Sequence, residues 1–371
     1  MLLQSDANRE MFKTLISGFH TNSLLNAIKT LKINRELVLH LNQFSKSKWQ
    51  HAKMVRTWEQ VTGTEVAQPT GNSKIFTLLS YNILAQDLLV EHLHLYIDIE
   101  PSKLRWDHRL SRLSDEIQHI KPDILCLQEM QFNHLQLFVK RISFKRELEY
   151  VFKKKTGHRT DGCAIIYDKS KFRFLAQQSV EYYIHGHTVL NRDNVAILAK
   201  FADKKLPENK FVIATTHLLY NPKRQNVRIA QVEVLLAAIQ KFSVENENGK
   251  STLLPVILTG DFNFEPETRP YRLLSEPFQP AQNWRISGGK ESNNNLQLAQ
   301  IDFGKNAAST FQQNWITVDY ILHSIDENRK KFQIQSVYAL PKITDCMRTG
   351  KIPNKYLGSD HYSLGIKFSV A

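Results

Sequence analysis

PVILTGDFNFEP, residues 255–266, is a run of aliphatic side chains that ends abruptly in an acid, an aromatic ring and an amide. Its aliphatic part is typical of a buried β-strand. Residues two apart on an extended chain point to the same side. We therefore predict that Asp261 and Asn263 face one point at the edge of a sheet.

Other apolar runs of the chain also carry or adjoin polar side chains. They are Asn82 in SYNIL, Glu129 in DILCLQE, His217 in ATTHL, Asp319 in TVDYIL, and Asp360 with His361 in GSDHYS. Taken singly, each has an ordinary structural explanation, such as a turn asparagine, a solvated glutamate or a core histidine. Acids beside aliphatic runs are costly unless they are paired or bind a metal. The joint pattern therefore predicts a functional site.

Eight short apolar runs read as strands, and two longer segments, 101–120 and 221–242, have helical periodicity. Asn221 is the expected cap of the second helix, with Pro222 in its first turn. Several strands lack alternation, as expected when both faces are covered. The predicted fold class is α/β, a two-sheet α/β sandwich with helices outside. We expect residues 1–70 to form an N-terminal extension with one helix and a linker, and residues 71–371 to form the catalytic domain.

Composition narrows the class of partner and compartment. The chain has 371 residues, a net charge of +13 and a sequence pI near 9.5, which favours a polyanionic partner. Its three cysteines include no CxxC pair, which argues for a reducing compartment and against a zinc site. No run approaches the ~20 apolar residues of a membrane span. We expect an intracellular protein without membrane attachment, cytoplasmic or nuclear, with a mitochondrial location left open.

The ordered motifs SYNIL, LQE, THL, GDFN, VDYIL and SDH, spread over residues 75–370, resemble those of the endonuclease/exonuclease/phosphatase family of metal-dependent phosphoesterases. The extended stretch LLSYNILAQDLLVEHLHLY is most similar to Angel-type members, which are close to nocturnin-like deadenylases. This resemblance implies the same two-sheet sandwich. It adds nothing for residues 1–70.

A phosphoesterase site must neutralise the charge of its substrate, and hard oxygen ligands suit Mg²⁺. The resemblance implies that Glu129 is the principal metal ligand, with Asn82 beside it bonding to the ligand or to phosphate. Asp360 is expected to serve the same metal or a second one. Mg²⁺ is the expected cofactor, with Mn²⁺ as the alternative, and one or two ions remain open.

The remaining site residues are expected to act on water and phosphate. Asp261 is the candidate for orienting or deprotonating the attacking water, and Asn263 for holding a phosphoryl oxygen. His361 would donate to a non-bridging oxygen, and Asp319 would orient its imidazole and favour the charged form. By family position, His217 would contact phosphate.

RNA is the expected substrate, because the chain is basic and the clusters 139–159 and 221–228 mix cations with aromatic side chains. The resemblance implies that the site acts on single-stranded 3′ ends. A merely solvated charged face is the alternative for either cluster. The Angel resemblance implies a phosphatase that opens and removes a 2′,3′-cyclic phosphate, and this is the expected function. The first alternative, implied by the nocturnin-like relatives, is a 3′–5′ exoribonuclease acting on poly(A), and the second is an RNA-binding adaptor without turnover. Protein partners are not indicated.

Overall fold

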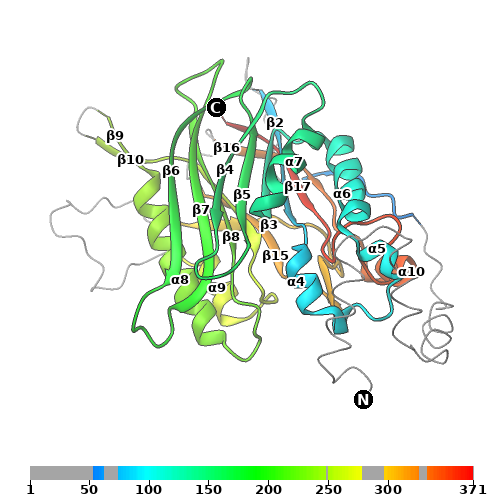
Figure 1. Cartoon of the computed structure of the whole chain (residues 1–371). Helices are drawn as coiled ribbons and strands as arrows, with labels where there is room; N and C mark the ends of the chain where they lie inside the picture. Colours follow the sequence, from blue (N-terminus) through cyan, green and yellow to red (C-terminus); the bar gives the residue numbers. More distant parts are fainter. Residues whose placement is uncertain (1–52, 62–73, 248–249, 278–295, 326–331, 371) are drawn as a thin grey trace, which may run out of the picture.

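The computed structural model describes residues 53–61, 74–247, 250–277, 296–325 and 332–370, and in them two large sheets pack face to face (Figure 1). The seven-stranded sheet has the order β1-β16-β17-β2-β3-β5-β4. Its strands are β1 (Trp58–Gln60), β16 (Phe332–Tyr338), β17 (Leu364–Val370), β2 (Ile75–Asn82), β3 (Ile124–Gln131), β5 (Asp161–Asp168) and β4 (Leu148–Lys154).

The six-stranded sheet has the order β12-β15-β11-β8-β7-β6. Its strands are β12 (Leu298–Gln300), β15 (Asp319–Ser324), β11 (Val256–Asp261), β8 (Lys210–His217), β7 (Asn191–Asp203) and β6 (Phe172–Tyr183). Two small hairpins accompany the sheets, β9 (Val244–Glu247) with β10 (Lys250–Leu253), and β13 (Thr310–Gln312) with β14 (Asn314–Ile316).

The central strands are apolar on both faces because both faces are covered. Phe76 and Ile124 pack between the sheets, whereas Leu79 and Leu125 on the same two strands pack against helices. Helices α6 (Trp106–Ile120) and α7 (Phe132–Ser143) cover the seven-stranded sheet, and α8 (Gln225–Ser243) and α9 (Arg269–Ser275) cover the other. The predicted α/β sandwich with outer helices is thus confirmed.

Short elements complete the end of the sandwich that holds the polar strand ends. Helix α4 (Gln86–Glu91), the 3₁₀ turn η1 (Leu93–Leu95) and α5 (Pro101–Leu104) follow β2, and α10 (Ile343–Thr349) follows β16. Leu84, Leu89, Tyr96 and Leu104 form a separate small apolar cluster there. This cluster fixes the segment after β2 beside the candidate site.

The expected start of the second long helix is wrong by a few residues. Helix α8 begins at Gln225, and the side chain of Asn221 accepts a bond from the backbone N–H of Lys223 instead, at 3.0 Å. The guanidinium of Arg228 donates to the carbonyls of Asn221 and Pro222, at 2.7 and 3.1 Å. These bonds stabilise residues 221–224 as a loop that precedes the helix.

Part of the expected N-terminal extension belongs to the sandwich. Strand β1 pairs with β16 at the edge of the seven-stranded sheet. The helix expected within residues 23–44 and most of the linker lie outside the described residues. No helix in the described ranges is long and apolar enough to cross a bilayer. The three cysteines, Cys126, Cys163 and Cys346, are free and buried.

Candidate metal centre and active site

Three of the predicted residues form one row across the end of the six-stranded sheet. In the β8–β11 ladder His217 lies opposite Asp261, and in the β11–β15 ladder Asp261 lies opposite Asp319. Residues directly opposite each other project to the same face of a sheet, so the three side chains are neighbours. All three are buried, with exposed fractions of 6%, 1% and 4%.

The seven-stranded sheet contributes Asn82 and Glu129 to the same point. Strands β2 and β3 are parallel, and Asn82 lies opposite Gln128, the residue before Glu129. The Asn82 amide donates to Glu129 Oε1 at 3.0 Å and to Asp261 Oδ2 at 2.9 Å. A single amide therefore joins the carboxylates of the two sheets.

The backbone of Glu129 has φ +58°, a left-handed conformation that is unusual for a residue with a long side chain. Its carboxylate is held from two sides, because the backbone N–H of Ala85 donates to Oε2 at 2.9 Å. A conformation of this kind costs about 1–3 kcal/mol and concentrates at functional sites. It aims the Glu129 carboxylate between the sheets.

His361 sits between two acids just before β17. Its Nδ1 lies 2.8 Å from Asp319 Oδ2, and its Nε2 lies 3.7 Å from Asp261 Oδ2. Burial alone would lower the pKa of His361, but Asp319 and Asp261 raise it well above its usual value. Its imidazole is therefore a proton donor over the neutral range.

Two groups of side chains in the described part of the chain could hold a metal ion. They are Glu129, His217 and Asp261, and Asp261, Asp319 and His361, with ligand atoms within 4.8 Å of one another in each group. Asp261 is common to both. His217 Nδ1 is buried without a hydrogen-bond partner and lies 4.0 Å from Glu129 Oε1.

The electrostatics of this cluster favour a bound cation. Burial and the nearby Asp360 raise the pKa of Glu129, although Lys155 opposes the change. Burial and Asp319 raise the pKa of Asp261 to about 7. Burial, Lys155 and His361 depress the pKa of His217, so its imidazole is neutral and able to act as a ligand. Crowded carboxylates with a neutral histidine form a donor set that fits a divalent metal.

Asn263 reaches the site by a different route from the one expected. Strand β11 ends at Asp261, and Asn263 has φ +54°, so the alternation of an extended chain does not apply to this pair. Its backbone N–H donates to Asp261 Oδ1 at 3.0 Å, and its side-chain amide donates to the carbonyl of Leu218, also at 3.0 Å. Asn263 therefore braces Asp261 and the end of β8.

Asp360 lies outside both metal-capable groups of the described residues. Its Oδ2 accepts a bond from the Tyr96 hydroxyl at 2.7 Å. Its charge nevertheless acts on Glu129, as the raised pKa of that residue indicates. Next to it, Ser359 donates to the carbonyl of Asn82 at 2.6 Å, which ties the SDH segment to the end of β2.

Sequence reasoning missed Arg109, a fully buried cation that supports the site. Its guanidinium donates to the carbonyls of Ile83, at 3.2 Å, and Leu84, at 2.6 Å. Those carbonyls precede Ala85, whose N–H holds Glu129. Burial lowers the pKa of Arg109 to about 10, against the attraction of Asp360. A signal was available, since Arg109 lies four residues before Leu113 on the buried face of its helix.

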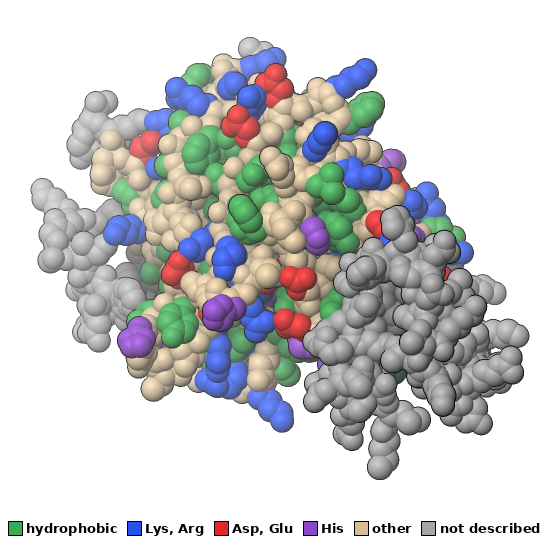
Figure 2. Space-filling view, in the orientation of Figure 1, with side chains coloured by type: hydrophobic (Ala, Val, Ile, Leu, Met, Phe, Trp, Pro, Cys, Tyr) green, Lys and Arg blue, Asp and Glu red, His purple; other side chains and the backbone are tan. Residues whose placement is uncertain are grey.

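The two basic clusters are less open than the sequence suggests. Within 139–159, Lys153 pairs with Glu181, and Lys155 pairs with the buried Asp161 at 2.6 Å. In 221–228, the Arg228 guanidinium is bound to loop carbonyls, as described above. Figure 2 shows Lys and Arg side chains interspersed with acids on this face, not gathered in one stripe.

The fold and the site together define a hydrolase of phosphoric esters built on a two-sheet sandwich. The sequence profile of the Endonuclease/Exonuclease/phosphatase family matches residues 79–361, and the chain belongs to this family.

Its relatives are Angel proteins. The chain is 46% identical to protein angel of Drosophila melanogaster over 85% of this chain and 86% of that protein. It is 35% identical to human angel homolog 1, over 68% of this chain and 39% of that protein. It is 31% identical to zebrafish (Danio rerio) angel homolog 2, over 70% of this chain and 47% of that protein. The chain thus spans less than half the length of these two vertebrate relatives.

Two solved structures are similar to the sandwich. ANGEL2, described as a 2′,3′-cyclic phosphatase and crystallised with adenosine-2′,3′-vanadate, is 27% identical with a TM-score of 0.70, over 86% of this chain and 99% of that one. The human nocturnin catalytic domain with a bound sulfate is 23% identical with a TM-score of 0.59, over 85% of this chain and 98% of that one, and supports the fold alone.

Proposed function

We propose that this protein is a Mg²⁺-dependent phosphoesterase that hydrolyses and removes the 2′,3′-cyclic phosphate at the 3′ end of RNA. The observation that carries the proposal is the similarity to ANGEL2, a 2′,3′-cyclic phosphatase crystallised with adenosine-2′,3′-vanadate. The joined carboxylates and histidines at the strand ends supply the groups that such a reaction needs. The net charge of +13 agrees with an RNA substrate.

In this proposal Glu129 is the principal metal ligand, and His217 and Asp261 are close enough to share the ion. Asp360 would assist from beside Glu129, as a water-mediated ligand or at a second ion. Mg²⁺ is favoured by the carboxylate oxygens, with Mn²⁺ as the alternative, since Mn²⁺ accepts imidazole and carboxylate together. When bound, the ion neutralises charge that develops on the phosphoryl oxygens.

The proposed reaction consumes two water molecules. The first attacks phosphorus, the bond from phosphorus to one ribose oxygen breaks, and that oxygen takes a proton to leave a linear monoester. The second water displaces the other ribose oxygen, which releases phosphate and leaves a 2′,3′-diol. Asp261 would orient each water and accept its proton, because it is buried and its pKa is raised to about 7.

The other residues would act on the phosphate. His361, kept cationic by Asp319, would donate from Nε2 to a non-bridging oxygen. Asn82 would keep Glu129 and Asp261 in register, and Asn263 would steady Asp261. In addition to these roles, His217 and Asn263 would each contact the phosphate directly. The proposal includes a cytoplasmic or nuclear location, with a mitochondrial location as the alternative.

The test uses two RNA oligonucleotides, one ending in a 2′,3′-cyclic phosphate and one ending in poly(A) with a free 3′-hydroxyl. With Mg²⁺ present, we expect release of phosphate from the first at unchanged chain length and no shortening of the second. Glu129→Ala and excess chelator should each abolish the release. Shortening of poly(A) with the cyclic end intact would favour the exoribonuclease. RNA binding without turnover of either substrate would favour the adaptor.

A further inference from the structure

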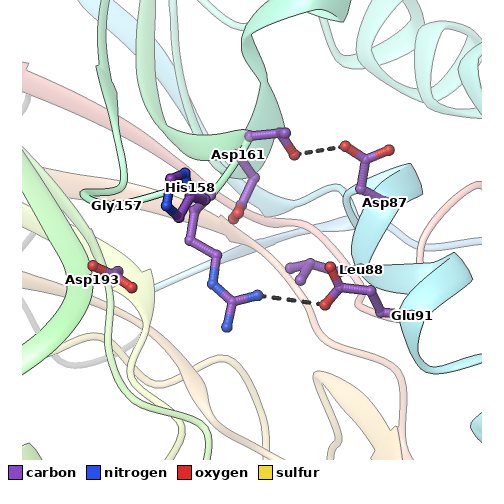
Figure 3. Close-up of a pocket in the computed structure, with 9 residues that line it drawn as sticks. Asp87, Leu88, Glu91, Gly157, His158, Asp161 and Asp193 are labelled. Atoms are coloured by element: carbon purple, nitrogen blue, oxygen red, sulfur yellow. Dashed lines mark hydrogen bonds and ion pairs between the residues drawn. The ribbon is translucent and has the colours of Figure 1, made fainter.

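A cavity of about 450 Å³ lies between helix α4 and the turn that joins β4 to β5 (Figure 3). The wall from α4 carries Asp87, Leu88 and Glu91, and the opposite wall carries His158 and Arg159. Small-molecule sites typically have volumes of ~300–1,000 Å³. The space is therefore large enough for one nucleoside.

Each wall of the cavity contains residues that adjoin groups of the candidate metal centre. Helix α4 begins directly after Ala85, whose N–H holds Glu129. Asp161, another lining residue, pairs with Lys155, whose charge acts on the pKa of Glu129. The charge of Asp161 itself also acts on Glu129, so the cavity borders the candidate metal centre.

The third wall is the start of β7, where Asp193 lines the cavity. The next residue, Asn194, donates to the carbonyl of His217 at 3.0 Å. Gly157 permits the turn to approach this wall, because a Cβ at that position would lie 3.1 Å from Asp193 Oδ1, and its φ is +61°. The turn and β7 are thus held together at the mouth of the site.

The lining combines flat cationic or aromatic groups with hydrogen-bond acceptors. Arg159 reaches across to Glu91 at 3.4 Å, and Thr160 donates to Asp87 Oδ2 at 2.7 Å, as the dashed lines in Figure 3 show. Thr156 donates to Asp193 Oδ1 at 2.5 Å. Each carboxylate has two oxygens and about four lone-pair sites, so these bonds leave capacity to accept more.

This chemistry suits a nucleobase better than a phosphate. Unstacked RNA bases bind proteins by stacking on histidine rings or guanidinium planes and by hydrogen bonds along their edges. His158 and Arg159 offer the stacking groups, whereas three carboxylates would repel a phosphate. Carboxylates accept from the exocyclic amino groups of adenine, cytosine and guanine, and uracil has no such donor.

We propose that this cavity binds the nucleoside that carries the cyclic phosphate and favours bases with an exocyclic amino group over uracil. The inference rests on the proposed function, since it adds base selectivity to the same site. Asp87, Glu91 and Asp193 are the specificity residues. They bind the base and take no part in the hydrolysis.

The experiment measures kcat/KM for the 2′,3′-cyclic monophosphates of adenosine, cytidine, guanosine and uridine. We expect kcat/KM for the three amino-bearing substrates to exceed that for the uridine substrate by about tenfold, which is the effect of one good polar contact to a base. In the double variant Asp87→Asn with Asp193→Asn, the ratio of kcat/KM between amino-bearing and uridine substrates should fall towards one. The fall should come from a higher KM for the amino-bearing substrates, and kcat/KM for the uridine substrate should change less than about threefold. Glu208→Gln is the matched control, because that exposed acid lies at the far end of β8.

An unchanged ratio in the double variant, or equal rates for all four substrates with wild-type protein, would overturn the proposal. If wild-type protein hydrolyses none of the four and also releases no phosphate from the RNA oligonucleotide with a cyclic end, the proposed function fails, and the cavity is then tested by binding. Calorimetric titration with adenosine and uridine 3′-monophosphates should still show a preference for adenosine that the double variant loses. Equal binding of both nucleotides would refute the cavity assignment independently of catalysis.

Discussion

The imidazole Nδ1 of His361 lies 2.8 Å from Oδ2 of Asp319, and both side chains are buried between the sheets. Asp319 starts β15, and His361 precedes β17 of the other sheet. The pair therefore crosses the sandwich. It holds the histidine with its second nitrogen towards Asp261, and the two acids keep the pKa of His361 well above its usual value.

Asp319→Asn should lower the pKa of His361, because the variant loses a charge that favours the imidazolium. The proton on His361 is lost as pH rises through its pKa, so the alkaline limb of the activity profile should move to lower pH. The measurement is kcat/KM for a cyclic-phosphate substrate from pH 5 to 10. Asp345→Asn, at a surface position of α10, is the control. An alkaline limb at the wild-type position would contradict the role given to Asp319.

Asp261→Asn should reduce turnover by about 10²–10⁴-fold, the range for loss of a general base. It should also change how stability depends on pH without metal. An unfolded aspartate titrates near ~3.9, whereas the pKa of Asp261 in the folded protein is about 7. The folded state binds this proton more tightly, so the stabilisation is complete below about pH 4 and disappears as pH rises to about 7.

Urea titrations of chelator-treated protein at pH 4, 5.5 and 7 test this linkage. The difference in unfolding free energy between wild type and Asp261→Asn reports on Asp261 together with its coupling to His361, whose pKa Asp261 raises. Wild type should lose more stability than the variant over this range. Parallel pH dependences would show that Asp261 is not protonated in the folded state.

Glu129 combines a function with a strained backbone, so its substitutions should separate activity from stability. Glu129→Ala and Glu129→Gly should both abolish turnover. Glycine adopts a positive φ freely, whereas alanine does not, so Glu129→Gly should be more stable than Glu129→Ala by about 1 kcal/mol. Thermal and urea unfolding of the two variants give the comparison. Equal stabilities would mean that the left-handed backbone is not costly there.

Arg109→Lys keeps the charge but loses the planar fork that holds the carbonyls before Ala85. We expect about 2–4 kcal/mol of destabilisation, since buried acceptors lose their partners. The Mg²⁺ concentration for half-maximal activity should rise, because Ala85 no longer fixes Glu129. Excess Mg²⁺ should restore turnover in the fraction that stays folded.

The control for Arg109→Lys is Arg112→Lys on the same helix, a partly exposed residue paired with Asp115. It should change neither the stability nor the Mg²⁺ requirement by much. A normal Mg²⁺ requirement in Arg109→Lys would leave Arg109 with a purely structural role.

The sequence predicts the strand ends well because each depends on local information. An apolar run followed by Glu129 or Asp261 marks both a strand and its polar tip, and the two sheets then bring these tips together. The prediction that Asp261 and Asn263 project to one side of an extended strand is wrong, because Asn263 has a left-handed backbone that depends on the tertiary structure. The start of α8 differs from the prediction because the side chain of Arg228, in the first turn of the helix, binds the carbonyls of residues 221 and 222 and stabilises a loop there.

Helix α7 and the role of Arg109 are predictable from the sequence. Leu135, Phe138, Val139 and Ile142 have helical spacing, which predicts the helix from local information alone. Contacts such as that of Tyr96 with Asp360 could not be predicted from the sequence, since they join residues far apart in the chain. Pairings of this kind depend on how the loops fold over the strand ends, and no local pattern encodes them.

Strand β1 ends the seven-stranded sheet, and Arg56 beside it donates to the carbonyls of Ala339 and Ser363 and lies over the Tyr338 ring. Without this strand, β16 would expose a row of unsatisfied backbone groups that can template pairing with another molecule. Shortening the chain to residue 74 onwards would retain every catalytic side chain and yet promote aggregation. Strand β1 thus protects the edge of the sheet, a role that is separate from chemistry.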